Sequence, residues 1–99
     1  MSQFSAHAPA IATVLIDDAT TRVTRWDFEP GAETGWHKHG LAYVVVPMTD
    51  CCFLLREAEG ERRVNVARGA AYARDAGMEH NVINGGDAFM SFIEIEMKR

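Results

Sequence analysis

The sequence predicts an all-β domain, a sandwich or a barrel built from short antiparallel strands. Turn-forming residues recur at intervals of eight to twelve positions, and the segments between them are short and rich in Val, Ile, Tyr, Phe and Thr. None of these segments carries the apolar stripe of a helix, whereas several alternate apolar and polar residues. The turn signals are Asp17-Asp18, Pro30-Gly31, Gly40, Thr49-Asp50, Glu59-Gly60, Arg68-Gly69, Ala76-Gly77 and Asn84-Gly85-Gly86-Asp87.

Eight strands are expected between these turns. Along the last one, Ile93 and Ile95 alternate with Glu94 and Glu96, which predicts one face toward the core and one toward solvent. Pro47 cannot donate a ladder hydrogen bond, so we expect it at a strand end or a sheet edge. The expected strands cover residues 12–16, 21–28, 41–47, 51–56, 62–66, 70–74, 80–83 and 88–97.

The segment 41–46 differs from the others because it is apolar on both faces. Either this strand is central in the structure, or its outer face meets another subunit. A domain of this size has little surface with which to cover both faces, which favours the second alternative and predicts a homodimer.

Length and composition restrict the class of protein. A chain of 99 residues has room for one core, so we expect a single domain over residues 10–99 preceded by a flexible N-terminal arm, residues 1–9. The net charge of −4 is made of interspersed acids and bases, which argues against a nucleic-acid or polybasic membrane surface. No apolar run approaches the roughly 20 residues of a membrane span.

A cytoplasmic location is expected from two features. The first residues lack the basic and apolar regions of a secretory signal. The adjacent Cys51 and Cys52 could form a redox or metal-binding pair, but they are better interpreted as free thiols at the start of a strand.

His37 and His39 are the first indication of chemistry. Positions i and i+2 of an extended segment share a face, so two imidazoles can converge on one ion. Imidazole is the commonest metal ligand among side chains near neutral pH. The spacing alone is equally compatible with two exposed surface histidines.

Two spaced motifs extend this pattern. The first runs Gly31, five residues, His37, Lys38 and His39, and the second runs Gly69, five residues, Asp75, Ala76, Gly77, two residues, His80, three residues and Asn84. In this order and spacing the sequence resembles a small single-domain cupin. The resemblance implies a double-stranded β-helix, or jelly-roll, barrel with a metal site. The sequence around the motifs is also similar to that of small cupins named for β-alanine degradation. The residues that carry this similarity are Thr34-Gly35-Trp36-His37, 43–47 and Gly77-Met78-Glu79-His80.

One departure from the family pattern affects the chemistry. The glutamate that follows the second histidine in the family's first motif is replaced here, where Tyr43 and Val44 stand. The resemblance therefore implies three ligands, His37, His39 and His80, as in the three-histidine cupins that include thiol and diketone dioxygenases. Three neutral ligands leave the charge of a divalent ion uncompensated, which favours an anionic substrate. The sequence does not distinguish Fe, Zn, Ni and Mn as the single divalent transition metal.

Two further side chains are candidates for the catalytic site. The Tyr43 phenol could donate a hydrogen bond to a bound substrate, or Tyr43 could be a core aromatic. Arg74 could pair with a substrate carboxylate, and Tyr72 shares its face, but a surface ion pair with Glu79 or Asp75 is the alternative that we favour. Trp36 is expected in the core or an interface, and Asn84 in a turn.

The resulting hypothesis is a metal-dependent, dioxygenase-like cupin that acts on a small anionic metabolite, in β-amino acid or small carboxylate catabolism. The alternatives are a non-catalytic sensor that binds a small ligand at the same metal, and a cupin whose histidines bind no metal. Neither nucleic acid nor a membrane is expected as a partner.

Overall fold

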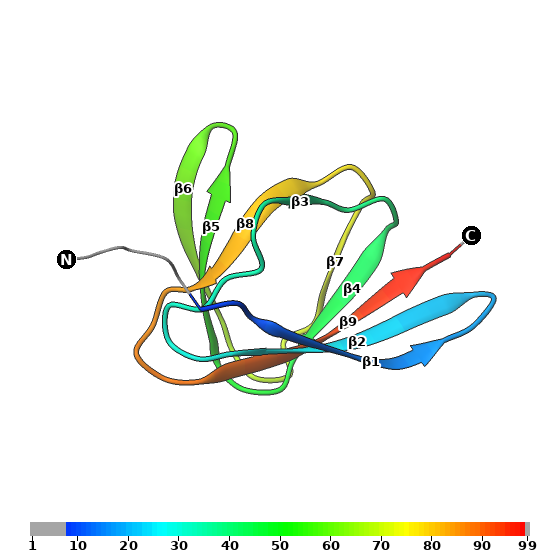
Figure 1. Cartoon of the computed structure of the whole chain (residues 1–99), viewed down its shortest axis with the longest axis horizontal. Helices are drawn as coiled ribbons and strands as arrows, with labels where there is room; N and C mark the ends of the chain where they lie inside the picture. The colour runs from blue at the N-terminus through cyan, green and yellow to red at the C-terminus, as the bar shows by residue number, and fades with distance from the viewer. Residues whose placement is uncertain (1–7, 99) are drawn as a thin grey trace.

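The computed structural model describes residues 8–98, and these residues form two antiparallel β-sheets that enclose one core (Figure 1). The prediction of an all-β fold is confirmed. The strands are β1 (Ile11–Asp17), β2 (Thr21–Phe28), β3 (His37–Lys38), β4 (Tyr43–Pro47), β5 (Cys51–Glu57), β6 (Gly60–Val66), β7 (Tyr72–Arg74), β8 (Glu79–Asn84) and β9 (Met90–Met97). Within residues 8–98, no helix is long and apolar enough to cross a membrane.

The two sheets pair strands that are far apart in the sequence. One sheet has the order β1-β2-β9-β4-β7, and the other has the order β3-β8-β5-β6. Figure 1 shows the β1–β2 and β5–β6 hairpins extending in different directions from the region where the sheets meet. Residues of β3, β4 and β8 line a cavity between the sheets.

Aromatic side chains join the two sheets in the core. Phe28 and Phe92, both of the five-stranded sheet, stack with ring centroids 5.6 Å apart. Phe53 of β5 meets Phe92 edge to face at 5.5 Å, so the contact crosses from one sheet to the other. Phe28 and Met90 are fully buried.

Turn chemistry at the predicted positions sets the strand ends. The Asp18 carboxylate accepts hydrogen bonds from the backbone N–H groups of Thr20 and Thr21, at 3.0 and 2.9 Å, and this closes the β1–β2 turn. Gly77 has a φ of 99° and donates its N–H to the carbonyl of His39 at 2.7 Å. Only glycine adopts that conformation readily, so Gly77 allows the chain before β8 to hold the histidine segment.

Strand β9 alternates as predicted, but the acids are on the inside. Glu94 and Glu96 are buried within the barrel, whereas Ile93 and Ile95 lie partly exposed on the outer face. The buried Phe92 has the same parity as the two acids and places them on its own side of the strand.

Strand β4 is interior to its sheet, between β9 and β7, and it ends at Pro47 as predicted. Tyr43 and Val45 are buried on the inner face, and Val44 and Val46 are half-buried on the outer face. The strand is therefore central in its sheet and also has an apolar outer face. Both alternatives for the segment 41–46 remain compatible with the structure.

The expected N-terminal arm lies largely outside the described residues. Of its members, Ala8 and Pro9 are described, and both lie against Glu33. The Ala8 carbonyl accepts a hydrogen bond from the N–H of Glu33 at 3.0 Å, and Pro9 forms an isolated parallel bridge with Glu33. These two residues are therefore attached to the barrel.

Candidate metal centre and pocket

The three histidines of the two motifs are brought together by strand pairing. His37 on β3 stands directly opposite His80 on β8 in the antiparallel register. His39 follows β3, and its N–H donates to the carbonyl of Met78 at 2.8 Å. The short strand β3 was not among the predicted strands, although the extended conformation of its segment was.

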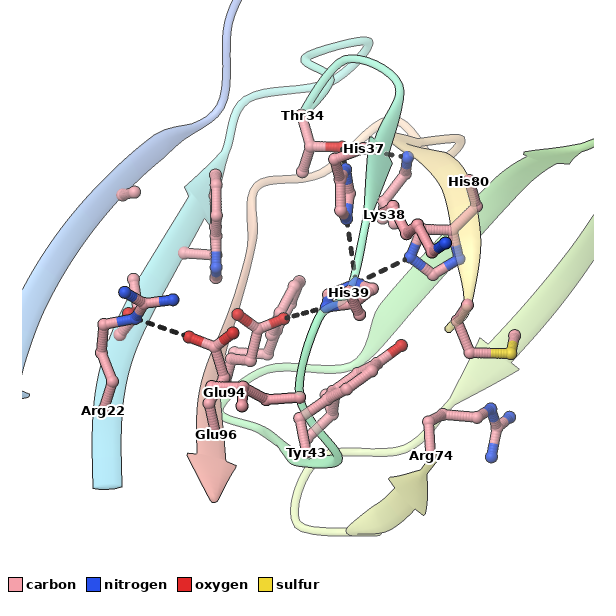
Figure 2. Close-up of a pocket in the computed structure, with 18 of the residues that line it drawn as sticks. Arg22, Thr34, His37, Lys38, His39, Tyr43, Arg74, His80, Glu94 and Glu96 are labelled. Atoms are coloured by element: carbon pink, nitrogen blue, oxygen red, sulfur yellow. Dashed lines mark hydrogen bonds and ion pairs between the residues drawn. The ribbon is translucent and has the colours of Figure 1, made fainter. Parts of the chain in front are cut away.

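The three side chains converge through the same ring atom. Nε2 of His39 lies 3.0 Å from Nε2 of His37 and 3.1 Å from Nε2 of His80. Figure 2 shows the three rings directed toward one point. The structure therefore removes the alternative of two exposed surface histidines, since His39 is only 7% exposed and His37 is half-buried.

These separations fit a divalent transition metal. Imidazole nitrogens bind such ions at about 2.1 Å, so two ligands about 90° apart are separated by about 3.0 Å, and two at the tetrahedral angle by about 3.4 Å. The observed 3.0 and 3.1 Å match the smaller angle. The donor set thus suits an ion with three ligands on one side and open positions on the other.

The Nδ1 atoms of the three histidines have different surroundings. Nδ1 of His37 lies 2.9 Å from the carbonyl oxygen of Gly35, an arrangement in which Nδ1–H donates and Nε2 keeps its lone pair for a metal. Nδ1 of His39 faces a carboxylate oxygen of Glu94 at 3.9 Å. Nδ1 of His80 is buried and has no hydrogen-bond partner among residues 8–98.

Burial keeps two of the rings neutral. Loss of hydration first, and then the neighbouring rings of His37 and His80, lower the pKa of His39 to about 4. Burial, followed by the effect of His37, likewise lowers the pKa of His80 to about 4. At neutral pH both rings are in the deprotonated form that a metal requires.

Tyr43 is a core aromatic that also contacts the histidine cluster. It is 3% exposed and belongs to the core, and its ring stacks on His39 with centroids 4.0 Å apart. Burial raises the pKa of its phenol to about 12, so the hydroxyl stays a donor at physiological pH. Figure 2 shows the hydroxyl end directed toward the side of the pocket that carries His80.

Arg74 does not form the surface ion pair that we favoured. Its guanidinium lies 4.6 Å from the centroid of the Tyr72 ring, and its Nη1 donates to the carbonyl of Ala73 at 2.9 Å. Among residues 8–98 it has no ion pair with Glu79 or Asp75. In Figure 2 the side chain points away from the histidines, so Arg74 borders the pocket and does not contact the histidine cluster.

Two other expectations concern residues beside the motifs. Trp36 is 54% exposed, so it is not a core residue, because its neighbour His37 takes the inward-facing position. Asn84 closes a turn as predicted: its amide donates to the carbonyls of Phe28 and Ala88 and accepts from Gly86.

Glu94 and Glu96 are the site residues that the sequence reasoning missed. Glu96 accepts a hydrogen bond from Arg22 at 2.7 Å, whereas no lysine or arginine among residues 8–98 pairs with Glu94. Burial, and then the charge of Glu96, raises the pKa of Glu94 to about 7. Its carboxylate faces Nδ1 of His39, not Nε2, so Glu94 does not replace the glutamate ligand that the family motif has and this chain lacks.

A cavity of about 520 Å³ joins these groups, a size typical of small-molecule sites. It reaches from the histidines, past Tyr43, to the acids of β9. Its charged lining residues are Asp17, Arg22, Lys38, Arg62, Arg74, Glu94 and Glu96.

Comparison with known proteins agrees with the fold. No family model matches the chain. The β-alanine degradation protein BauB of Pseudomonas aeruginosa is 50% identical over 94 residues, which are 95% of this chain and 99% of BauB. A cupin domain of Bordetella pertussis Tohama I superposes with a TM-score of 0.94 at 48% identity, over 97% of this chain and 100% of that one.

A more distant structure shows the fold alone. It is a Klebsiella pneumoniae protein with a double-stranded β-helix domain, with a TM-score of 0.76 at 17% identity, over 96% of this chain and 82% of that one. The barrel and the two spaced motifs define a cupin, and the chain belongs to the cupin family. Within the family it is a small cupin that resembles BauB over nearly its whole length.

Proposed function

We propose that this cupin is a cytoplasmic metalloprotein that binds one divalent transition metal through His37, His39 and His80 and acts on a small carboxylate. The convergence of the three Nε2 atoms, at 3.0 and 3.1 Å, is the observation that carries the proposal. The name of the relative BauB associates that protein with β-alanine degradation, and we extend the same catabolic role to this chain.

A bound ion would supply Lewis acidity and open coordination positions, which suit metal-dependent oxygenation of a small carboxylate or diketone. The chain's own residues orient and shield this centre. Hydrogen bonding to Gly35 fixes the ring of His37, and stacking on Tyr43 fixes the ring of His39. The Tyr43 hydroxyl, which remains protonated, is placed to donate a hydrogen bond to a bound ligand.

Positive side chains border the cavity on the side of β3, β6 and β7. Lys38, Arg62 and Arg74 line it there, and Arg62 is paired with Glu57. The remaining positive charge favours entry of an anionic group, in agreement with the uncompensated charge that three neutral ligands would leave on the ion.

Oxygen consumption tests the reaction. Protein reconstituted with Fe(II) should consume oxygen with one of a panel of small thiols, diketones and β-amino acid derivatives, and His80→Ala should abolish this activity. Stoichiometric metal and saturable ligand binding without turnover would instead identify a non-catalytic binding module. Absence of metal binding would refute the proposal.

A homodimer through the outer face of the five-stranded sheet is also proposed. In the strand register Ile16, Val23, Ile95 and Val44 form one apolar row across β1, β2, β9 and β4. The charges of Arg25 and Asp27 on the same face pair with each other at 3.2 Å, so the face presents no uncompensated charge to a second copy of itself. Such a self-complementary apolar face is typical of a two-fold dimer.

A further inference from the structure

The cavity contains a buried carboxylate that the metal centre does not use. Glu94 is only 9% exposed, lines the cavity, and among residues 8–98 has only the indole N–H of Trp26 as a weak hydrogen-bond partner. Its nearest ionisable contact is Nδ1 of His39, 3.9 Å away. A buried carboxylate with so little compensation is unfavourable, so a group from outside the chain is the natural candidate to satisfy it.

Among residues 8–98, no lysine or arginine forms an ion pair with Glu94, and Arg22 acts on it only through its charge. The residues directly opposite it in the sheet are Thr24 on β2 and Val45 on β4, and neither carries a charge. The guanidinium of Arg22 is engaged by Glu96 at 2.7 Å. In Figure 2, Glu94 lies between this ion pair and the His39 ring, with its carboxylate directed toward His39.

The indole of Trp26 supplies little compensation to this carboxylate. Trp26 lines the cavity beside Glu94, and its buried Nε1–H faces the carboxylate without a hydrogen bond of good geometry. An ionised carboxylate accepts several hydrogen bonds, so most of the acceptor capacity of Glu94 is left for a ligand or for water.

We infer that Glu94 binds the ammonium group of a small amino-carboxylate, an inference that rests on the proposed function. The carboxylate end of this ligand lies toward the three-histidine centre. The negative wall at Glu94 and the positive side at Lys38 and Arg74 give the cavity opposite charges at its two sides. A zwitterion matches both, whereas a simple anion leaves Glu94 uncompensated.

The distance between the two subsites restricts the length of the ligand. Nε2 of His39 faces the other two histidines, and Nδ1 of the same ring faces Glu94. A ligand that touches both subsites therefore spans little more than one imidazole ring. This favours a short ω-amino acid over a long-chain or bulky one.

Calorimetric titration of the metal-loaded protein with two isosteric probes tests the inference. β-Alanine carries both charges, and butanoate replaces its ammonium by a methyl group. A charge-assisted hydrogen bond to Glu94 should make β-alanine bind about 10-fold or more tightly than butanoate. In Glu94→Gln this preference should fall to about one, while butanoate affinity and metal content stay unchanged.

Two variants make the result specific. Glu94→Asp keeps the charge and should retain part of the preference, and Glu59→Gln removes an exposed acid remote from the cavity and should retain all of it. Equal affinity of the wild-type protein for both probes, no measurable binding of β-alanine, or a preference that survives in Glu94→Gln would each overturn the inference.

Failure of the metal proposal is visible separately, in the metal content measured before each titration. If no metal binds, the same pair of probes on the metal-free protein still compares ammonium with methyl. A preference for β-alanine there supports the Glu94 subsite even though the metal centre has failed, and equal affinity refutes it.

Discussion

Replacing Glu94 by Gln should change the pH dependence of stability in the metal-free protein. Burial, followed by the charge of Glu96, raises the pKa of Glu94 from 4.5 to about 7 in the folded state. In the unfolded chain the carboxyl titrates near its ordinary value. Between these two pH values the folded state holds the proton more tightly, so stability decreases as the pH rises from about 4.5 to about 7. Glutamine has a similar size and cannot ionise, so it removes this decrease.

The size of the effect follows from the interval between the two pKa values. From 4.5 to about 7, at about 1.4 kcal/mol per pH unit, the decrease amounts to about 3 kcal/mol. Most of this interval lies between pH 5 and pH 8. Over that range we expect Glu94→Gln to gain about 2–3 kcal/mol of unfolding free energy relative to the wild-type protein.

Urea unfolding at pH 5 and pH 8, with a chelator present, measures this difference. The exposed Glu59→Gln is the control, and its difference from wild type should not vary with pH. A Glu94→Gln difference that is equal at the two pH values, or larger at pH 5, would refute the reasoning. A gain in stability together with a loss of β-alanine preference would show that the carboxylate is present for binding and lowers stability.

Two further predictions concern the sheet face and the turn before β9. Val44→Lys should convert the proposed dimer to a monomer in sedimentation experiments, because it puts a charge in the apolar row, while the exposed Ala58→Lys should not. A wild-type monomer, or a dimer that persists in Val44→Lys, would contradict the proposed interface. Asn84→Ala should lower the unfolding free energy measured in urea by about 3 kcal/mol, since the carbonyls of Phe28 and Ala88 lose their buried donor. A loss below about 1 kcal/mol would show that the turn does not depend on this amide.

Much of the fold follows from local sequence. The Asp18 turn and the positive-φ position of Gly77 lie where turn chemistry predicts them, and the strand between Thr21 and Phe28 has the predicted bounds. These features depend on neighbouring residues alone. The pairing of β2 with β9 and of β5 with β8 joins distant segments, so local sequence does not determine it, and the family resemblance implied the barrel without a strand order.

The histidine cluster was predicted in two ways. His37 and His39 share a face by parity, and the resemblance of the second motif to the cupin pattern added His80. The position of Glu94 was not recognised, because a pattern that alternates Ile with Glu suggests that the acids face solvent. Here the interior of the barrel is a polar site and the outer face is apolar, which reverses the usual assignment. The core residue Phe92, of the same parity as Glu94, was the signal that could have shown it.

Arg74 and Trp36 illustrate what side-chain type cannot predict. A surface arginine beside acids is expected to pair with them, but the aromatic ring of Tyr72 offers a contact that is fixed by the strand. Trp36 is large and apolar, yet the inward position beside it is taken by His37, so the indole lies on the surface.

Metal stoichiometry combined with X-ray absorption at the metal edge tests the central claim most directly. The wild-type protein, and His7→Ala as the histidine-matched control, should bind one divalent ion per chain with three imidazole nitrogens at about 2.1 Å. His80→Ala should lose the ion or retain it weakly with two imidazoles. No stoichiometric metal in the wild-type protein, or an unchanged ion and imidazole count in His80→Ala, would contradict the assignment of His37, His39 and His80 as the metal centre.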